Sequence, residues 1–297
     1  MKLRCIIILV MYVLLTTIVF PLEAQELNID TSRNITRCLG NDQSPAWSHD
    51  GKKLLFQSDR NGNWDIFMYN TKLDTVVQLT EGKENERNPC WFPGEKAICY
   101  DAGEEAQTYL YKKNLQSGDV MPVFSRNIIC KDASFTRDGR MIYFLGYSKQ
   151  YGKWELYSYH YVYDVLNKLA DDGDNIVYYN LSPDAKRVLY GYETYPYPYR
   201  RMRIINWYSE PEERMEDYNV TAAEWYPGGL KIYFISDKDE LTGELYSMWQ
   251  DKTHLHRLTK DDYEIKDFAI APDGITIACS VLLDGNYEII IITPEPD

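Results

Sequence analysis

The sequence predicts an all-β fold, a six-bladed β-propeller of four-stranded antiparallel blades. Three observations support this prediction. One sequence motif recurs six times, and its copies align without a gap. Its strand-like segments alternate apolar and polar residues, and the two ends of the chain supply complementary parts of one repeat. A period of about 40–45 residues with four strands per unit is typical of a propeller blade, whereas paired helices would space apolar residues three and four apart.

Each copy of the motif has an apolar anchor residue, a polar turn and a strand in which apolar and polar residues alternate. In the first copy a polar loop follows at Ser58–Asn63, then a third strand at Asp65–Tyr69 and a closing strand at Val77–Thr80. Asp-Gly and Pro-Gly pairs in the polar turns favour tight connections between strands. The anchors are spaced by 44, 44, 46, 44 and 45 residues; they are Trp47, Trp91, Phe135, Leu181, Trp225 and Ile270.

The ends of the chain predict how the ring closes. The sixth copy stops after its third strand, Glu288–Thr293, and lacks a closing strand. The segment Asn34-Ile-Thr36 precedes the first copy, and Thr36 lies 11 residues before Trp47, as Thr80 lies 11 residues before Trp91. We therefore expect this N-terminal strand to complete the last blade, so that no strand edge is left to recruit another chain.

The first 24 residues have the layout of a secretory signal. Lys2 and Arg4 precede an apolar run, Cys5–Phe20, and Ala24 offers a small residue at the cleavage point. We expect cleavage after Ala24, which leaves residues 25–297 as a single propeller in the periplasm or at the cell envelope, with no membrane span and no second domain. An uncleaved N-terminal anchor is the alternative, because Glu23 makes a poor cleavage site.

Composition narrows the classes of partner. The chain carries 45 acidic and 32 basic residues, a net charge of −13, which argues against a nucleic-acid partner. It contains 26 tyrosines, and tyrosine favours strands as well as binding surfaces. We expect Tyr100, Tyr143, Tyr190 and Tyr233 to fill the space between blades, because they lie in strands of the repeat.

Candidate metal ligands and nucleophiles form no known site. His254 and His256 lie two residues apart on a closing strand, and His49 occupies a turn. The loop Asp59–Asp65 spaces oxygen ligands like a calcium loop but lacks the distal bidentate glutamate. There is no Gly-x-Ser-x-Gly elbow for a serine hydrolase. A pectin-lyase-like site would need several histidines near the central channel, and the four histidines are not distributed in that way, so we expect no catalytic residue, metal or cofactor. Five cysteines beyond the signal show no metal-binding spacing, and Cys99 and Cys279 are expected to be buried; the five are Cys38, Cys90, Cys99, Cys130 and Cys279.

The repeat resembles that of the TolB family. Four segments of the first copy carry the resemblance: Trp47-Ser-His-Asp-Gly51, Ser58-Asp-Arg-Asn-Gly62, Asp65-Ile-Phe67 and Leu79-Thr80. The resemblance covers nearly all of the chain after the signal and implies a propeller. It implies no single function, because similar repeats occur in peptidase propeller domains, pectin-fragment lyases and stand-alone envelope proteins. We expect no counterpart of the N-terminal domain that precedes the TolB propeller.

The first candidate binding surface is the mouth of the central channel. In propellers the loops that lead into the first strands share a face with the loops between the second and third strands. Residues three and four positions before the anchors therefore line the mouth, or else they merely line a water-filled channel and bond one another. The candidates are Arg87, Asn88, Lys131, Asp132, Tyr178, Lys266 and Asp267.

The second candidate surface is an aromatic and basic rim formed by two neighbouring loops. The fourth-blade loop departs furthest from the repeat, and prolines stiffen it, which lowers the entropy cost of presenting its rings. The alternative is that the rings pack on one another between blades. The residues are Tyr192, Tyr195, Tyr197, Tyr199, Arg200 and Arg201 in the fourth blade, and Tyr147, Tyr151 and Trp154 in the third.

These features together predict a non-catalytic, exported binding module. We expect it to dock a protein or peptide of the cell envelope as a monomer, because rigid Tyr and Arg side chains are favoured as interface anchors. The alternative is a carbohydrate-binding protein or a lyase-like propeller that acts on glycan fragments, since Tyr and Trp also stack on sugar rings.

Overall fold

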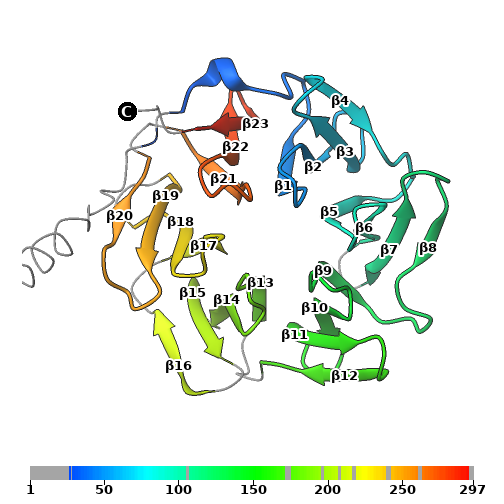
Figure 1. The fold of residues 1–297 in the computed structure, drawn as a ribbon, viewed down its shortest axis with the longest axis vertical. Helices are drawn as coiled ribbons and strands as arrows, with labels where there is room; N and C mark the ends of the chain where they lie inside the picture. The colour runs from blue at the N-terminus through cyan, green and yellow to red at the C-terminus, as the bar shows by residue number, and fades with distance from the viewer. Residues whose placement is uncertain are drawn as a thin grey trace, which may run out of the picture.

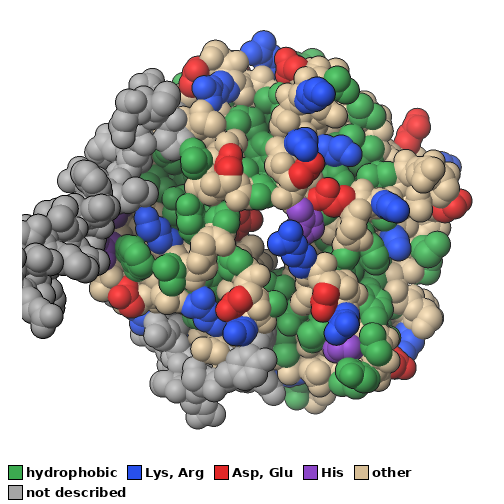
Figure 2. All heavy atoms as spheres, in the orientation of Figure 1, with side chains coloured by type: hydrophobic (Ala, Val, Ile, Leu, Met, Phe, Trp, Pro, Cys, Tyr) green, Lys and Arg blue, Asp and Glu red, His purple; other side chains and the backbone are tan. Residues whose placement is uncertain are grey.

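Six antiparallel sheets are arranged in a ring around a central opening, with the first strand of each sheet nearest the centre (Figure 1). The space-filling view shows the opening, with acidic, basic and histidine side chains at its edge on this face (Figure 2). The predicted six-bladed propeller is confirmed.

The computed structural model describes residue 27 and residues 29–104, 107–170, 175–194, 197–206, 209–215, 219–238, 242–259 and 263–293. The side chains of residues 194, 197–199 and 209–215 are not described. The predicted signal segment and Tyr195 therefore lie outside the described residues. Among those described, none belongs to a helix of the length and apolarity that crossing a bilayer requires.

Strand order follows chain order in every blade. Blade one contains β1 (Asp42–Trp47), β2 (Lys53–Ser58), β3 (Asp65–Asn70) and β4 (Thr75–Gln78). Blade two contains β5 (Glu86–Trp91), β6 (Ala97–Ala102), β7 (Tyr109–Asn114) and β8 (Val120–Pro122). Blade three contains β9 (Cys130–Phe135), β10 (Met141–Ser148), β11 (Lys153–His160) and β12 (Val165–Lys168).

The second half of the ring continues the pattern. Blade four contains β13 (Asn175–Leu181), β14 (Arg187–Thr194), β15 (Tyr197–Asn206) and β16 (Ser209–Met215). Blade five contains β17 (Val220–Trp225), β18 (Lys231–Ser236), β19 (Glu244–Trp249) and β20 (His256–Arg257). Blade six contains β21 (Ile265–Ile270), β22 (Ile277–Leu283) and β23 (Asn286–Ile292).

The N-terminal segment closes the ring where the sixth blade lacks a fourth strand. A short 3-10 helix, η1 (Thr31–Arg33), leads into Asn34, which forms an antiparallel bridge with Ile290 of β23. The backbone N–H of Ile35 donates to the carbonyl of Ile289 at 3.0 Å. The segment lies where the sequence predicted it, although it pairs through a single bridge rather than a regular strand.

The core consists of hydrophobic clusters between neighbouring blades. Leu55 and Ile66 of blade one pack with Trp91 and Ile98 of blade two, for example. Each large apolar side chain buried in this way stabilises the fold by about 1.5–3 kcal/mol. The prediction for the strand tyrosines is confirmed: Tyr100, Tyr143 and Tyr190 are buried and Tyr233 packs against a buried cluster. Cys99 and Cys279 are fully buried, as expected, and all five cysteines in the described chain are free.

The fourth blade differs from the expectation of a long loop over 192–201. Strand β14 extends to Thr194 and β15 begins at Tyr197, and the register pairs Tyr192 with Arg201 and Glu193 with Arg200. The register then shifts before Thr194 pairs with Tyr197, so the irregularity falls at Pro198 and Tyr199. Proline has no N–H for a regular ladder, which explains why the disruption occurs there and not over the whole segment.

Candidate functional site

The innermost strands enclose a cavity of about 730 Å³ in the central channel. All six first strands contribute to its wall: β1, β5, β9, β13, β17 and β21. Seven residues predicted as candidate site residues line this cavity, so the structure brings together parts of blades two, three, four and six. They are Asn88, Lys131, Asp132, Tyr178, Arg200, Lys266 and Asp267.

Bulges in the first strands of blades one to three shape the cavity wall. Ser44, Asn88 and Asp132 have φ values of 53°, 50° and 53°, in the left-handed region, where the strand register shifts. Asparagine and aspartate tolerate this region better than most residues, because their short polar side chains bond locally. A bulge re-aims the backbone of its strand. Here it turns three N–H groups toward the neighbouring blade.

Each of these N–H groups is accepted by a side chain of the preceding blade. Ser44 donates to Oδ2 of Asp267 at 2.9 Å, Asn88 to Oε1 of Gln57 at 2.8 Å, and Asp132 to Oδ1 of Asp101 at 3.3 Å. Our sequence reasoning missed Gln57 and Asp101. A signal was available, because both are polar residues ten positions after an anchor, within otherwise apolar second strands.

Asp267 has one oxygen engaged and one free. Its Oδ2 accepts from Ser44, whereas its buried Oδ1 has no hydrogen-bond partner among the described residues. Burial raises the pKa of Asp267 to about 7, against a smaller opposing effect of the Ser44 N–H and of Lys266. At neutral pH this carboxyl can therefore either accept or donate a hydrogen bond at its free oxygen.

Glu224 is a second half-buried acid in the cavity wall, and sequence reasoning missed it. It immediately precedes the anchor Trp225, and its Oε2 accepts from the backbone N–H of Ile270 at 2.9 Å. Burial raises its pKa to about 7 as well. The detectable signal was a glutamate inside an inward-facing strand. With Asp267, it gives the channel two groups that change protonation near neutral pH.

Tyr178 forms part of the wall of blade four. A Cβ atom at Gly191, its neighbour on β14, would lie 2.0 Å from the Tyr178 ring, so the ring packs directly on the glycine backbone. The Tyr178 hydroxyl is buried without a partner among the described residues. Burial raises its pKa above the ordinary value, so the hydroxyl stays protonated and can donate to a ligand.

Asp101 and Asp132 form a second acidic pair beside the cavity. The Nδ2 of Asn88 donates to Oδ2 of Asp101 at 3.3 Å, while the Nζ of Lys131 lies 3.9 Å from Asp132. Burial raises the pKa of both carboxyls, and the charge of Asp132 adds to the effect on Asp101. The wall therefore contains carboxylates together with the cations Lys131, Lys266 and Arg200. Neither an anionic nor a cationic ligand is repelled by the whole wall.

Part of the predicted aromatic rim lies beside the channel. The Nζ of Lys131, which lines the cavity, is 4.7 Å from the ring centroid of Trp154, and that ring packs edge-on against Tyr147 at 5.2 Å. Tyr151 is 59% exposed, with the Nζ of Lys153 5.2 Å from its ring. Lys131 thus connects the rim of blade three to the channel.

The other predicted residues lie elsewhere. Tyr192 is 1% exposed and lies in the core of blade four under Arg203, whose Cζ is 4.4 Å from the ring. Its placement on the rim was wrong, because both faces of β14 are buried between blades, and Tyr192 packs with Val188 and Tyr190 against blade three. Arg87 stacks on Trp64, with its Cζ 5.8 Å from the ring, and does not line the cavity.

The remaining residues of the fourth-blade prediction are less defined. Arg201 pairs with Tyr192 in the sheet and is also absent from the cavity wall. Tyr195 lies outside the described residues, and for Tyr197 and Tyr199 only the strand backbone is described. Arg200 is therefore the member of this segment that the structure places at the channel, where its Nε lies 2.8 Å from Oε1 of Glu193.

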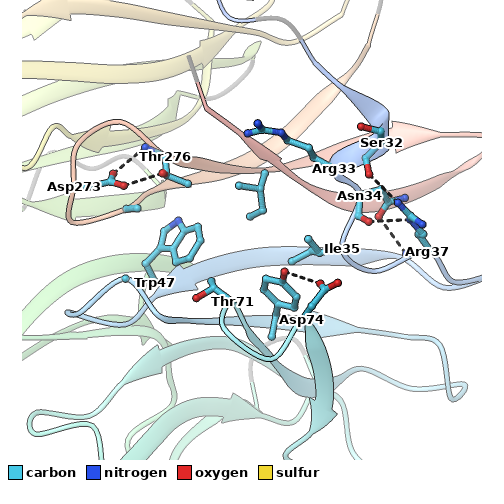
Figure 3. Close-up of a pocket in the computed structure, with 14 residues that line it drawn as sticks. Ser32, Arg33, Asn34, Ile35, Arg37, Trp47, Thr71, Asp74, Asp273 and Thr276 are labelled. Atoms are coloured by element: carbon cyan, nitrogen blue, oxygen red, sulfur yellow. Dashed lines mark hydrogen bonds between the residues drawn. The ribbon is translucent and has the colours of Figure 1, made fainter. Parts of the chain in front are cut away.

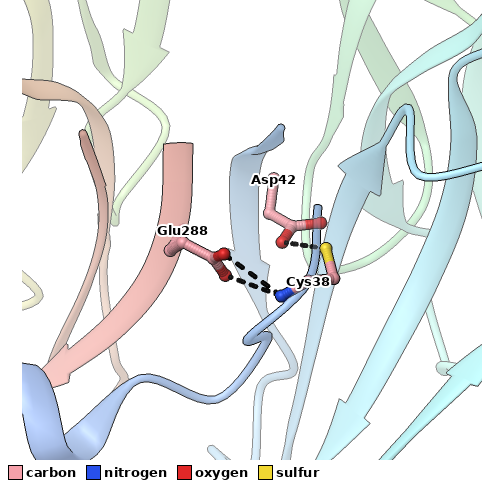
Figure 4. A group of neighbouring side chains, drawn as sticks. All are labelled: Cys38, Asp42 and Glu288. Atoms are coloured by element: carbon pink, nitrogen blue, oxygen red, sulfur yellow. Dashed lines mark hydrogen bonds between the residues drawn. The ribbon is translucent and has the colours of Figure 1, made fainter. Parts of the chain in front are cut away.

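One group of possible metal ligands lies at the ring closure, formed by Cys38, Asp42 and Glu288 (Figure 4). Each has a protein partner already. The guanidinium of Arg60 lies 2.8 Å from Asp42, and Glu288 accepts from the backbone N–H of Cys38 at 3.1 Å. Burial raises the pKa of the Cys38 thiol to about 11, which disfavours the thiolate that binds metals. These contacts join the ends of the chain.

Comparisons with known proteins agree with this architecture. The family model described as TolB beta propeller domain matches residues 12–196. None of the curated proteins matches this chain. Among solved structures, TolB from Acinetobacter baumannii is 18% identical with a TM-score of 0.62; the alignment covers 74% of this chain and 58% of that one. This chain therefore spans little more than half of that TolB.

Two solved enzymes have the same fold over most of their length. An oligogalacturonate lyase from Vibrio parahaemolyticus is 14% identical with a TM-score of 0.64, covering 90% of this chain and 96% of that one. A gluconolactonase from Xanthomonas campestris is 13% identical with a TM-score of 0.64, covering 92% and 95%. At such identities the likeness establishes the fold alone.

Proposed function

The chain belongs to the TolB beta propeller domain family, and on that premise we propose that it is a non-catalytic binding module. Its central channel receives a polar segment of a protein or peptide at the cell envelope. The proposal includes export to the periplasm, with the N-terminal signal segment removed by cleavage after Ala24.

The observation that carries this proposal is a pair of unpartnered polar atoms in one cavity. Asp267 offers a free carboxyl oxygen and Tyr178 a free hydroxyl, both buried and both in the wall. A buried polar atom without a partner costs about 1–3 kcal/mol, so a ligand that satisfies both gains affinity. A peptide supplies a donor and an acceptor at every residue, which matches this need.

The charges of the cavity favour a polypeptide of mixed charge. Lys131, Lys266 and Arg200 stand among carboxylates, so neither a polyanion nor a polycation meets complementary charge throughout. In the described part of the wall no histidine is present. His49, for example, lies instead in a turn, where its ring bonds Glu95 at 2.9 Å.

A second candidate function is recognition of an acidic saccharide at the blade-three rim. Tyr151 is exposed, and the ammonium groups of Lys153 and Lys168 lie 5.2 and 6.0 Å from its ring centroid. A sugar ring can stack on the aromatic face while its carboxylate approaches a cation. The shared fold with an oligogalacturonate lyase is compatible with this alternative.

Site-specific photocrosslinking tests the proposal in the envelope. A photoreactive phenylalanine derivative replaces Lys131 at the channel, and in a control it replaces Val77, an exposed residue of the outer strand β4. We expect a protein adduct at position 131 only, and its loss in the Tyr178→Phe, Asp267→Leu background. Equal adducts at both positions, or none at 131, would contradict docking in the channel.

The same experiment separates the two candidates. If binding is to a saccharide, no protein adduct forms at position 131, and an acidic oligosaccharide array gives a signal that Tyr151→Ala removes.

Export is tested separately, by mass spectrometry of the purified protein, which is expected to begin at Gln25. An intact Met1 in the envelope fraction would show that the signal is kept as an anchor.

A further inference from the structure

A second cavity, of about 650 Å³, lies on the seam between blade six and blade one (Figure 3). Trp47 at the end of β1 forms its aromatic wall, and Ile35 of the ring-closing segment forms an apolar wall. Asp74, after β3, and Asp273, before β22, contribute carboxylates. This cavity is separate from the central channel and shares no lining residue with it.

The equivalent tryptophans at two other seams are covered by a cation from the preceding blade. The Nζ of Lys53 lies 5.9 Å from the ring centroid of Trp91, and the Cζ of Arg187 lies 4.6 Å from that of Trp225. These two indoles are only 6% and 4% exposed. In both seams the cation is the first residue of the second strand, six positions after the anchor of its own blade.

At the seam of Trp47 this position belongs to blade six and is occupied by Thr276. The register is the same, because Ile270 pairs with Ile277 as Trp47 pairs with Leu54. Threonine is short and uncharged, and within the described chain no cation lies over the Trp47 ring. The indole is fixed in the same way as that of Trp91, since its N–H donates to Ala269 at 3.1 Å. Trp47 remains half-buried and faces the cavity (Figure 3).

The two carboxylates of this cavity, those of Asp74 and Asp273, lack a cationic partner among the described residues. Burial would raise the pKa of Asp273, but hydrogen bonds from the backbones of Ile275 and Thr276 and from the Thr276 hydroxyl, each 2.8 Å, hold it below its ordinary value. Asp74 accepts from the Tyr69 hydroxyl at 2.9 Å. Two carboxylates therefore line the cavity that the open face of Trp47 also lines.

The two arginines that line the cavity, Arg33 and Arg37, form hydrogen bonds with groups other than Trp47 and the two carboxylates. Arg37 donates to the carbonyls of Asn34 and Ser32 at 3.0 and 2.8 Å, and Arg33 bonds the hydroxyl of Thr293. Figure 3 shows Arg37 at the end of the cavity far from Trp47, beyond Ile35. Neither side chain covers the indole.

We propose that this seam pocket binds an ammonium or guanidinium group over the face of Trp47, in the place that Lys53 and Arg187 fill at the seams of Trp91 and Trp225. The face of a tryptophan ring attracts cations, and aromatic side chains recognise alkylated ammonium groups. The carboxylates of Asp74 and Asp273 in the same cavity favour a ligand of positive charge. The group can come from a small molecule or from a lysine or arginine side chain of a partner.

Titration with charged and uncharged probes tests this proposal. The probes are choline, Nα-acetyl-lysine amide and an analogue of choline in which carbon replaces nitrogen. The signal is the indole N–H resonance of Trp47, assigned with Trp47→Phe. We expect a saturable shift of this resonance with one or both cations, and an affinity for the uncharged analogue that is about tenfold lower. The resonances of Trp91 and Trp225 should not respond.

The two cationic probes distinguish the sources of the ligand. A response to choline alone indicates a small quaternary ammonium compound, and a response to the lysine derivative indicates a side chain of a partner. Sodium chloride at equal ionic strength controls for screening. No saturable shift with either cation, or equal affinity for the uncharged analogue, overturns the proposal without any variant.

A pair of substitutions at one position gives the matched control. Thr276→Lys introduces a cation like those at the seams of Trp91 and Trp225 and should abolish the probe response, because its own ammonium would cover Trp47. Thr276→Val has the same shape as threonine, adds no charge and should keep the response. Unchanged binding in a folded Thr276→Lys protein contradicts the proposed location.

Discussion

The hydroxyl of Thr36 lies 2.6 Å from the carboxylate of Glu288, a residue 252 positions later, and joins the N-terminal segment to the last strand. The same hydroxyl accepts the backbone N–H of Ile289 at 3.0 Å. Thr259 repeats the arrangement within blade five, where it accepts from Leu245 at 3.0 Å and contacts Glu244. Ring closure therefore reproduces a contact that other blades make between their own third and fourth strands.

Thr36→Val should destabilise the fold by about 2 kcal/mol, because it leaves the buried Glu288 carboxylate and the Ile289 N–H without this partner. Chemical denaturation measures the change in the free energy of unfolding. Thr75→Val, at an exposed position of β4, is the control and should change it little. Equal effects of the two substitutions would show that the closure contact contributes nothing specific.

Glu224 should make stability fall as pH rises through neutrality. Burial raises its pKa from 4.5 in the unfolded chain to about 7 in the fold. The contribution of Glu224 to the free energy of unfolding is thus fully present below pH 4.5 and is lost as pH rises through 7. The free energy of unfolding falls by at most about 3 kcal/mol over this range. Urea denaturation on either side of this window measures the loss. Glu224→Gln, which cannot titrate, should make the curve less steep and leave the contribution of Asp267, and an unaltered slope would contradict the assignment.

Gly191→Ala should destabilise blade four by about 1–3 kcal/mol, because the new methyl group would overlap the Tyr178 ring. The cause is tested by a double-mutant cycle. In a Tyr178→Ala background the glycine substitution should cost clearly less, since the ring is gone. Additive effects of the two substitutions, measured by denaturation, would show that the two residues are not in contact.

Asp267 should make docking in the channel depend on pH. Its pKa of about 7 means that the free oxygen changes from donor to acceptor across neutrality. In crosslinking from position 131, adduct yield should therefore change between pH 6 and pH 8. Asp267→Asn keeps an oxygen for Ser44 and removes the titration, so its yield should be constant. A persistent pH dependence in this variant would assign the effect to another group, such as Asp132.

The sequence was sufficient to predict the architecture because a propeller blade is local in sequence. Every strand of a blade follows its predecessor directly, so the spacing of anchors such as Trp47 and Trp91 reports the period of the fold. The missing closing strand after Glu288–Thr293 and the extra Asn34-Ile-Thr36 predicted the closure for the same reason. Positions before the anchors, including Asn88, Asp132 and Asp267, were located at the channel by this periodicity.

Only the tertiary structure decided which side chains are exposed and which are paired between blades. Tyr192 occurs in a tyrosine-rich segment, yet it is buried because its strand packs between two neighbouring blades. The partners of the bulges, Gln57 and Asp101, come from a neighbouring blade, and no local pattern fixes such contacts. Trp47 resembles Trp91 and Trp225 in sequence, but its open face depends on Thr276, more than two hundred residues away and adjacent only once the ring has closed.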